Sequence, residues 1–331
     1  MIGVIGGSGF IGTALVRALR AGGHAVRIID KAKSAALPDL CIEADVRDRE
    51  GLAAACAGCD TLYNLAAEHR DDVEPRSLYD AVNVAGAEHT CAAAARHGIE
   101  RILFTSTVAV YGLTNEEVDE SAPLRPFNDY GLTKLAAERV FEAWAAAARQ
   151  RSLTIVRPTV VFGPDNRGNV YTLLEQIARG RNFVIGSGDN RKSMAYVENV
   201  ADFLVYALRF GPGVQLYNYI DKPDLDMNEL VAVARSTLGK AGARPWRIPY
   251  GLGVGLGRTC DLVTRLTGVR FPISAVRVRK YGATTQFGAS RVAESGFVPR
   301  HDLRDSLIAT IWHEFGATGG AADAYRPASQ A

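Results

Sequence analysis

The sequence predicts an α/β fold: a doubly wound parallel sheet with a second, smaller domain of mixed α/β structure. Short β-branched runs alternate with alanine-rich helical patterns through the first half of the chain. A glycine-rich turn, GGSGFIG, follows the first apolar run directly and opens the first helix. After residue 157 this alternation gives way to loops and isolated apolar segments. Strand and helix repeated in this way force a parallel sheet with helices on both faces, and the change of pattern indicates a second domain.

Each element is expected from its own pattern. The strands are the short β-branched runs, and the helices are the longer periodic segments between them. Ligands of such sheets bind beyond the carboxyl ends of the strands, so the residues after each strand are candidates for the site. We expect strands at Ile2–Ile5, Ala25–Asp30, Thr61–Leu65, Arg101–Ser106 and Leu153–Arg157, and helices at Ile11–Ala21, Arg49–Ala57, Ser77–His97, Tyr130–Arg149 and Tyr196–Phe210.

The change of pattern also predicts the domain boundaries. Residues 1–157 are expected to form the sheet domain, and the chain near residues 195–221 is expected to return to it. Residues 158–194 and 222–315 are expected to form a lid domain over the sheet. The last residues, 316–331, are small and polar and are expected to form a flexible tail.

Composition excludes several classes of function. The chain has 331 residues, 47% of them hydrophobic, which is enough for a sizeable core. A net charge of +2 gives no reason to expect a nucleic-acid partner. Cys56 and Cys59 precede a strand instead of opening a helix, which favours packing over a redox role, and no metal site is expected. No signal peptide or membrane-spanning run is recognisable, and five cysteines suit a reducing compartment, so we expect a cytoplasmic protein.

The glycine turn predicts a dinucleotide site. Its GxxGxxG pattern, residues 6–12, lets a pyrophosphate approach the backbone and lie against the positive end of the following helix. Asp30 ends the second strand, where a carboxylate binds the adenosine ribose of NAD and repels the extra phosphate of NADP. Lys31 beside it leaves this preference open. Asp45, at the end of a third strand, could accept from the adenine amino group. It could also cap the next helix, and the two roles do not exclude each other.

A tyrosine and a lysine predict the chemistry. In FNDYGLTK, Tyr130 and Lys134 lie four residues apart where a helix begins, so they share a helix face. A phenol has a pKa near 10, and we expect the Lys134 ammonium and a positively charged nicotinamide together to lower the pKa of Tyr130. Lys134 is also expected to hold the nicotinamide ribose. A hydroxyl from Thr105-Ser106-Thr107, at the end of a strand, can share the substrate oxygen. A lone YxxxK is most often a surface pair, but the glycine turn and Asp30 upstream favour the catalytic interpretation.

Together these motifs resemble the extended short-chain dehydrogenase/reductase family. The matching strings are GGSGFIG, ADVRD, NLAA, VNVAG, STVAVYG, YGLTK and RPTVVFGP, and they cover nearly all of the chain to residue 315. The resemblance implies a Rossmann-type NAD-binding domain over residues 1–157 and NAD as the cofactor. The residues implied to bind it are Gly6, Gly9, Phe10, Ile11, Gly12, Asp30, Lys31, Asp45, Val46, Leu65, Ala66, Ala67, Asn83, Thr105, Tyr130, Lys134 and Pro158.

The same resemblance implies which residues are catalytic. In family members with S/T-x-x-x-Y-G, the catalytic hydroxyl lies four residues before that tyrosine, which here is Thr107. Thr107, Tyr130 and Lys134 are therefore implied to be catalytic. Tyr111 is then scaffold, and Asn83 is implied to support the strand that carries Thr107.

Longer strings resemble one group within the family. NLAAEHRDDVEP, NRGNVYTLL, KSMAYVENV, YNYIDKPDL and VRVRKYGATTQF are similar to bacterial 4-epimerases of N-acetylglucosaminyl-diphospho-undecaprenol, which serve O-antigen assembly. This implies a redox-neutral epimerase with a lipid-linked sugar diphosphate as substrate. Related sugar-nucleotide epimerases have an asparagine after the fifth strand, where this chain has Thr159 and Val160. The residues implied to bind substrate are Thr107, His69, Asn169, Lys192, Arg277, Arg279 and Lys280.

A basic segment follows in the lid. Residues 244–281 contain eight basic residues and one acid, Asp261, interleaved with apolar side chains. Such a segment suits peripheral docking on the anionic inner face of a membrane, although an amphipathic lid helix with solvated charges fits the same pattern.

Other functions stay open. A UDP-sugar 4-epimerase uses the same motifs. A dehydratase of this fold is expected to carry an acidic pair after Thr107, where this chain has Val108-Ala109. An NAD-sensing protein without catalysis is expected to lose the tyrosine or the lysine. Two alanine-rich helices, Ser77–His97 and Tyr130–Arg149, could form a homodimer interface.

Overall fold

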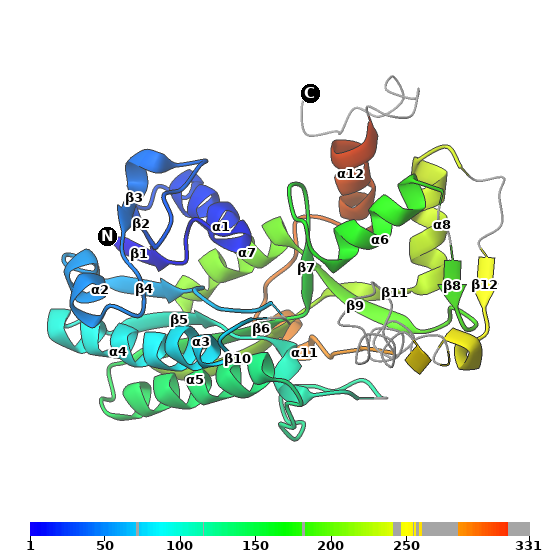
Figure 1. Cartoon of the computed structure of the whole chain (residues 1–331). Helices are drawn as coiled ribbons and strands as arrows, with labels where there is room; N and C mark the ends of the chain where they lie inside the picture. Colours follow the sequence, from blue (N-terminus) through cyan, green and yellow to red (C-terminus); the bar gives the residue numbers. More distant parts are fainter. Residues whose placement is uncertain are drawn as a thin grey trace.

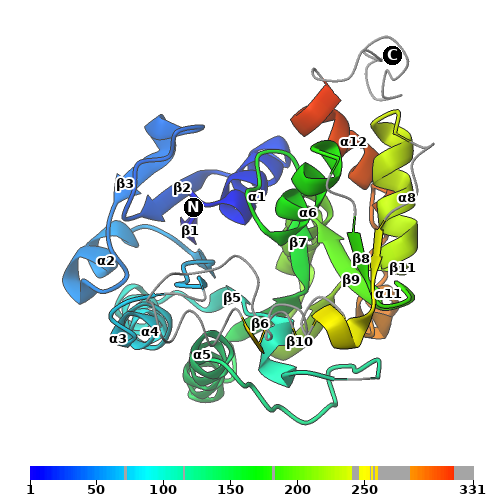
Figure 2. The same ribbon diagram turned by 45° about the vertical axis from the view of Figure 1, so that its right-hand side comes forward.

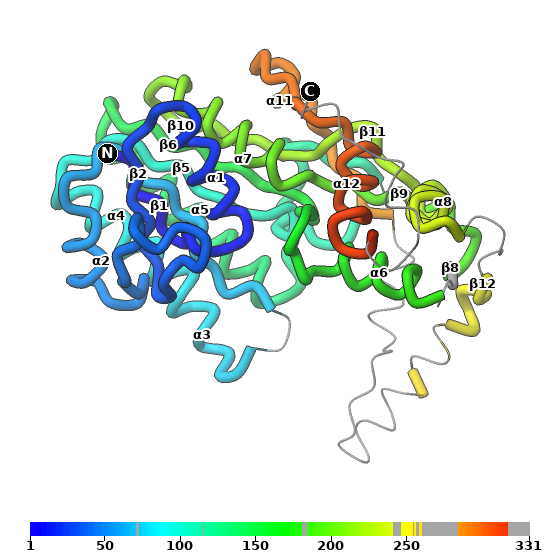
Figure 3. The backbone as a smooth tube through the Cα atoms, turned by 90° about the horizontal axis from the view of Figure 1, so that it is seen from above, coloured from blue at the N-terminus to red at the C-terminus, as the bar shows by residue number. Residues whose placement is uncertain are grey.

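The structure is a computed structural model in which a large parallel sheet lies beside a smaller lid (Figure 1). The sheet is built mainly from the first half of the chain, and the lid from later segments (Figures 1 and 3). The structure describes residues 1–70, 73–114, 116–180, 183–240, 246–253, 255, 258–259 and 284–316.

The main sheet has seven strands, all parallel, in the order β10-β6-β5-β4-β1-β2-β3. Every residue of β1 and β6 is buried, because both faces of the sheet are covered by helices. The strands are β1 Ile2–Ile5, β2 Val26–Asp30, β3 Cys41–Glu43, β4 Thr61–Asn64, β5 Arg101–Thr105, β6 Ser152–Pro158 and β10 Gly213–Tyr219. The predicted doubly wound sheet is confirmed.

Helices pack on both faces of this sheet (Figure 2). Helices α1 (Phe10–Ala21) and α7 (Val197–Tyr206) pack together on one face, where Leu15, Val16 and Phe203 join the core. On the other face lie α2 (Arg49–Ala55), α4 (Ala85–His97) and α5 (Asp129–Ala146). Cys56 and Cys59 are free thiols buried in the core of this second face.

The helix expected at Ser77–His97 is interrupted. A short α3 (Ser77–Tyr79) leads into a π turn over Asp80–Val84, and α4 begins at Ala85. A π turn has no hydrophobic period of its own, so the sequence pattern runs through it unchanged. The wider turn places Asn83 against the loop that follows β4.

The lid has its own sheet and core. Strand β9 (Arg191–Tyr196) lies between β7 (Val160–Phe162), to which it is parallel, and β11 (Asp221–Asp226), to which it is antiparallel. Helices α6, α8 and α12 pack on this sheet through Leu174, Leu230 and Leu307. The remaining lid elements are α6 Asn169–Ala178, β8 Phe183–Ile185, α8 Met227–Thr237, β12 Trp246–Ile248 and α12 Leu303–Phe315. Between the last two, α11 Ser290–Glu294 packs beside β10 of the main sheet, where Val292 joins the core.

Up to β11, the chain crosses between the two parts three times. It leaves the main sheet after β6, forms β7 to β9 of the lid, and returns as α7 and β10 before entering the lid again with β11. No helix among the described residues is long and apolar enough to cross a membrane. Most of the basic segment and the tail beyond Gly316 lie outside the described residues.

Candidate active site

A cavity of about 730 Å³ lies beyond the carboxyl ends of β1, β4, β5 and β6, under the lid strands β7 and β9. It brings together nearly all of the described residues that the sequence nominated. The exception is Asn83, which does not line the cavity. The nominated residues that do are Gly6, Gly9, Phe10, Ile11, Gly12, Asp30, Lys31, Asp45, Val46, Leu65, Ala66, Ala67, His69, Thr105, Thr107, Tyr130, Lys134, Pro158, Asn169 and Lys192.

The glycine turn leaves no room for side chains. A Cβ on Gly6 would lie 2.5 Å from the Ala66 nitrogen, and one on Gly12 would lie 2.5 Å from the Gly6 carbonyl oxygen. Gly6 also has φ +79°, which favours glycine. The N-cap of α1 is Gly9, whose lack of a side chain leaves the first amide groups of the helix without a capping oxygen. This cradle at a helix N-terminus fits a pyrophosphate.

Two further groups fit a dinucleotide. The Asp30 carboxylate borders the cavity and is oriented by the amides of Ser8 and Ala32, at 3.0 and 3.2 Å. The Thr105 hydroxyl is buried at the same cavity without a hydrogen-bond partner among the described residues. The residues present therefore fit NAD.

Asp45 also borders the cavity, but Arg47 engages its carboxylate. Arg47 Nε donates to both carboxylate oxygens of Asp45 at 3.0 Å, and this pairing lowers the pKa of Asp45. The alternative role of Asp45 as a helix cap is wrong. Asp48 caps α2 instead, accepting from the amides of Glu50 and Gly51 at 3.2 and 3.1 Å.

Tyr130 and Thr107 meet at the inner wall of the cavity. Tyr130 lies in the first turn of α5, which Asn128 caps by accepting from the Gly131 amide at 3.0 Å. Thr107 follows β5 and its hydroxyl orients the next turn by accepting from the Ala109 amide at 3.1 Å. Burial raises the pKa of Tyr130 to about 12, while a hydrogen bond with the Thr107 side chain acts in the opposite direction.

Lys134 lies deeper than expected. Its ammonium donates to the Thr105 carbonyl oxygen at 2.7 Å and lies 4.0 Å from the centre of the Phe104 ring. Burial lowers the pKa of Lys134 to about 7, and the Glu138 carboxylate opposes this effect. In the protein without NAD, desolvation dominates at the phenol, and the Lys134 ammonium donates to strand β5. That Lys134 and the nicotinamide of bound NAD together lower the pKa of Tyr130 stays a prediction.

Asn83 has a different role from the one the family resemblance implied. Its side-chain oxygen accepts from the Glu68 amide at 2.9 Å, and its amide donates to the Glu68 carbonyl oxygen at 3.1 Å. The same amide group donates to the Thr133 hydroxyl at 2.9 Å. Asn83 therefore ties the loop after β4 to helix α5 and does not support the strand that carries Thr107.

His69, Asn169 and Lys192, the described residues expected to bind substrate besides Thr107, also line the cavity. Burial lowers the pKa of Lys192 to about 8. The Thr159 hydroxyl, at the position after β6, donates to the Ser193 carbonyl oxygen at 2.8 Å and so braces β9. The other nominated substrate residues, Arg277, Arg279 and Lys280, lie outside the described residues.

Among the described residues, one group could offer ligands to a metal ion. Asp165, His313 and Glu314 bring their ligand atoms within 4.8 Å of one another at the surface. These groups already bond to one another and to Arg167, which pairs with Glu314 at 2.6 Å. The cluster lies outside the cavity lining and adds nothing to its chemistry.

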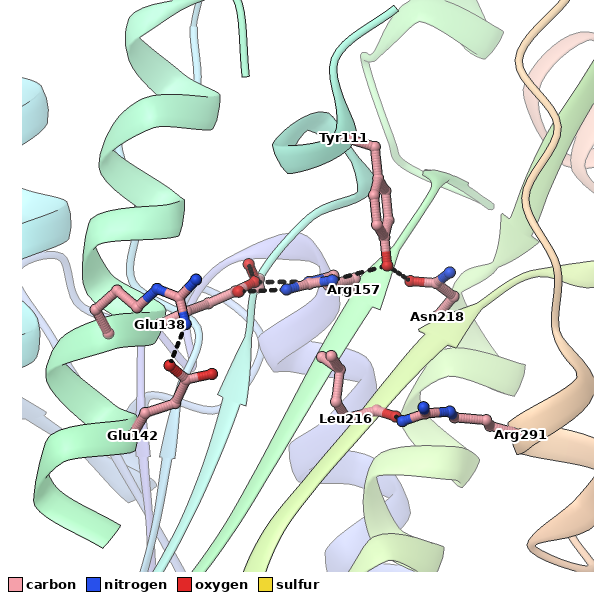
Figure 4. Close-up of polar contacts among 9 residues, drawn as sticks. Tyr111, Glu138, Glu142, Arg157, Leu216, Asn218 and Arg291 are labelled. Atoms are coloured by element: carbon pink, nitrogen blue, oxygen red, sulfur yellow. Dashed lines mark hydrogen bonds and ion pairs between the residues drawn. The ribbon is translucent and has the colours of Figure 1, made fainter. Parts of the chain in front are cut away.

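Sequence reasoning missed a buried ion pair next to Tyr130 and Lys134 on α5. Glu138 lies one turn after Lys134 on α5 and pairs with Arg157 on β6 at 2.6 Å (Figure 4). Two signals were present: the acid continues the four-residue spacing of Tyr130 and Lys134, and an arginine interrupts the apolar strand SLTIVRP.

The comparisons with known proteins agree with this geometry. The family model of the NAD dependent epimerase/dehydratase family matches residues 2–218. The N-acetyl-alpha-D-glucosaminyl-diphospho-ditrans,octacis-undecaprenol 4-epimerase of Escherichia coli O157:H7 is 47% identical over 314 residues, which are 94% of each chain. MoeE5, solved with UDP-glucose and NAD, is 25% identical with a TM-score of 0.73, covering 96% of this chain and 99% of its own.

A second solved structure shares the fold. The UDP-glucose 4-epimerase of Thermotoga maritima, solved with UDP-glucose, is 20% identical with a TM-score of 0.75, covering 94% of this chain and 97% of its own. The glycine cradle, the Tyr130 and Lys134 pair and the match over two thirds of the sequence lead to one conclusion: the chain belongs to the NAD-dependent epimerase/dehydratase family, within the extended short-chain dehydrogenases/reductases.

Proposed function

We propose that this protein is an NAD-dependent 4-epimerase that interconverts the N-acetylglucosaminyl and N-acetylgalactosaminyl forms of a sugar diphosphate linked to undecaprenol, a step of surface-polysaccharide assembly. The observation that carries the proposal is the 47% identity to the Escherichia coli O157:H7 enzyme over 94% of both chains. The cavity adds chemical support, since one space holds the dinucleotide cradle and the Tyr130 phenol.

The chain's own residues handle the proton. Tyr130, as phenolate, accepts the proton of the sugar 4-hydroxyl and later returns it to the 4-oxygen. The Thr107 hydroxyl binds the same oxygen. NAD, which the glycine cradle and Asp30 would hold, would supply the hydride acceptor for C4 and the hydride donor for the opposite face of the 4-keto sugar. Between the two transfers, the lid shields the 4-keto sugar from bulk water and keeps it from leaving the site.

The deciding experiment compares two substrates. N-acetylglucosaminyl-diphospho-undecaprenol in detergent and UDP-N-acetylglucosamine are supplied at matched concentration to NAD-loaded enzyme, and the 4-epimers are separated. We expect fast conversion of the lipid-linked sugar and poor conversion of the UDP-sugar, because Thr159 braces β9 where nucleotide-sugar enzymes carry an amide. Equal or faster conversion of UDP-N-acetylglucosamine would contradict the lipid-linked substrate. The protein would then be a sugar-nucleotide epimerase, like its UDP-glucose 4-epimerase relative from Vibrio cholerae.

We also propose peripheral docking on the cytoplasmic face of the inner membrane. The described part of the basic segment exposes large apolar side chains: Trp246 is 82% and Leu252 is 65% exposed. Exposed apolar groups beside arginines suit an anionic lipid surface. The test is sedimentation with anionic vesicles of the variant Arg258→Glu/Arg265→Glu/Arg270→Glu, which should bind less. The matched control, Arg17→Glu/Arg20→Glu/Arg149→Glu, makes the same charge change on the sheet domain, and equal losses in both variants would contradict a specific docking face.

We propose further that the protein is a homodimer. Helix α5 leaves Leu132 51% exposed, and α4 lies beside α5 on the same face of the sheet. If α4 and α5 of one copy packed against α4 and α5 of a second copy, the exposed sides of both helix pairs would be buried in a four-helix interface. Analytical ultracentrifugation should give a dimer that Leu132→Glu converts to monomer; a monomeric parent protein would contradict the proposal.

A further inference from the structure

The Glu138–Arg157 pair is almost completely removed from water. Arg157 Nε donates to Glu138 Oε1 at 2.9 Å, a terminal nitrogen donates to Oε2 at 2.6 Å, and the side chains are 1% and 3% exposed (Figure 4). Burying two charges has a high desolvation cost, and apolar replacements of such pairs are often as stable. A stabilising role is therefore a weak explanation for this pair, and its contacts indicate another.

The Glu138–Arg157 pair forms a hydrogen bond to the segment before Thr107. The Ser106 hydroxyl donates to Glu138 Oε1, the same oxygen that Arg157 Nε contacts. One turn earlier on α5, Lys134 donates to the Thr105 carbonyl oxygen at 2.7 Å. Helix α5 is thus fixed to the end of β5 at two successive residues, and both fixing groups lie on the face of the helix that carries Tyr130.

The Glu138–Arg157 pair also forms a hydrogen bond to the segment after Thr107. Arg157 donates to the Tyr111 phenol oxygen at 2.7 Å, and Tyr111 donates to the Asn218 side-chain oxygen at 2.8 Å (Figure 4). Tyr111 ends the short turn Val108–Tyr111, which starts directly after Thr107. Thr107 therefore lies between two residues, Ser106 and Tyr111, that bond to the two members of one ion pair.

The pair supplies the charge that faces Lys134. Tyr130, Lys134 and Glu138 follow one another at four-residue intervals on α5, and the Glu138 carboxylate favours the charged form of Lys134. Arg157, on β6, carries the same positive charge as Lys134, but its guanidinium bonds to Glu138 and to Tyr111. Without Glu138, Lys134 and Arg157 would be two buried cations with no carboxylate between them.

We propose that Glu138 is a positioning residue for the reaction: clamped by Arg157, it fixes Thr107 through the residues on either side and supplies the negative charge opposite Lys134. The proposal rests on the epimerase function of the same site. Glu138 acts through Ser106, Arg157 and Lys134 and does not line the cavity.

Two variants separate position from charge. Ser106→Ala removes the link to the strand and keeps the ion pair, so kcat should fall roughly tenfold, which corresponds to one hydrogen bond to a charged group, while the titration of Lys134 stays as in the parent. Glu138→Gln/Arg157→Gln removes both charges together, which avoids a lone buried cation. Its kcat should fall further, with KM little changed. Glu142→Gln is the matched control, since it lies one turn further along α5 and loses only a surface pair with Arg139.

The charge state of Lys134 is measured as a function of pH by NMR with 13C-labelled lysine. The chain has seven lysines, and the Lys134 signal is the one missing from Lys134→Met. The pKa of Lys134 should fall by about one unit or more in the double variant, as expected for loss of a near opposite charge, and should not move in Glu142→Gln. An unchanged Lys134 titration in a folded double variant, or parent-like kcat in both test variants, overturns the proposal. If the parent protein epimerises neither substrate, the proposed function fails, and the NMR titration still decides whether Glu138 controls Lys134.

Discussion

Replacing Lys134 by methionine should make the protein more stable, by an amount that depends on pH. Lys134 is 1% exposed, and burial lowers its pKa from 10.5 to about 7. At 1.36 kcal/mol per pH unit, this difference corresponds to about 5 kcal/mol. Between about pH 7 and pH 10.5, the unfolded chain binds a proton that the folded chain has lost. The free energy of unfolding of the parent therefore rises by about 1.4 kcal/mol per pH unit in this range. Lys134→Met lacks this group and lacks this rise.

The assay is urea unfolding of both proteins, followed by circular dichroism at several pH values. The advantage of Lys134→Met should be greatest below pH 7 and should shrink by about 3 kcal/mol between pH 7.5 and 9.5. All other groups titrate in both proteins and cancel in the difference. Lys33→Met, at an exposed position, is the control and should show no comparable slope. An advantage that is constant over this range, or a variant less stable than the parent throughout, would refute the reasoning.

Three further predictions concern the site. Tyr130→Phe should abolish epimerisation while NAD binding, followed by calorimetry, survives, because only the proton acceptor is lost; a rate within tenfold of the parent would remove Tyr130 as the base. Thr107→Val should lower kcat by about 10- to 100-fold, the value of a hydrogen bond to a developing charge, and steady-state kinetics with an unchanged kcat would exclude Thr107 from the reaction. Asp30→Ala should narrow the preference for NAD over NADP, since it removes both the ribose acceptor and the charge that repels the extra phosphate; equal affinities of the parent for the two cofactors would contradict this role.

The parallel sheet could be predicted because its strands are buried on both faces and its helices are amphipathic, so local pattern and global fold agree. The glycine turn and the strand-end positions of Asp30 and Thr107 then place a site without further information. The three-stranded lid sheet was not predictable in the same way. Its strands β7, β9 and β11 come from distant segments and pair through contacts that no local pattern encodes.

Side-chain partners were the least predictable part of the site. The sequence places Lys134 on the same helix face as Tyr130, but the choice of the Thr105 carbonyl as its partner depends on how closely α5 packs on β5. The expected strand contact of Asn83 and the helix-cap alternative for Asp45 were wrong for a related reason, since a π turn redirects Asn83 and a neighbouring arginine engages Asp45. Desolvation, which dominates the titration of both Tyr130 and Lys134, is a property of the packed protein and has no signature in sequence.

The return of the chain to the main sheet constrains the order in which the protein can be made. Strand β10 pairs with β6 over all seven residues, from Gly213 to Tyr219, and covers an edge that would otherwise be open. During synthesis this edge stays uncovered until residue 219 has left the ribosome, and β11, α8 and α12 of the lid, which follow it in the chain, emerge only later. An open strand edge is a template for pairing with another chain. The same interleaving means that no single cut separates two foldable halves, and a lid transferred from a relative has to be inserted at two places, on either side of α7 and β10.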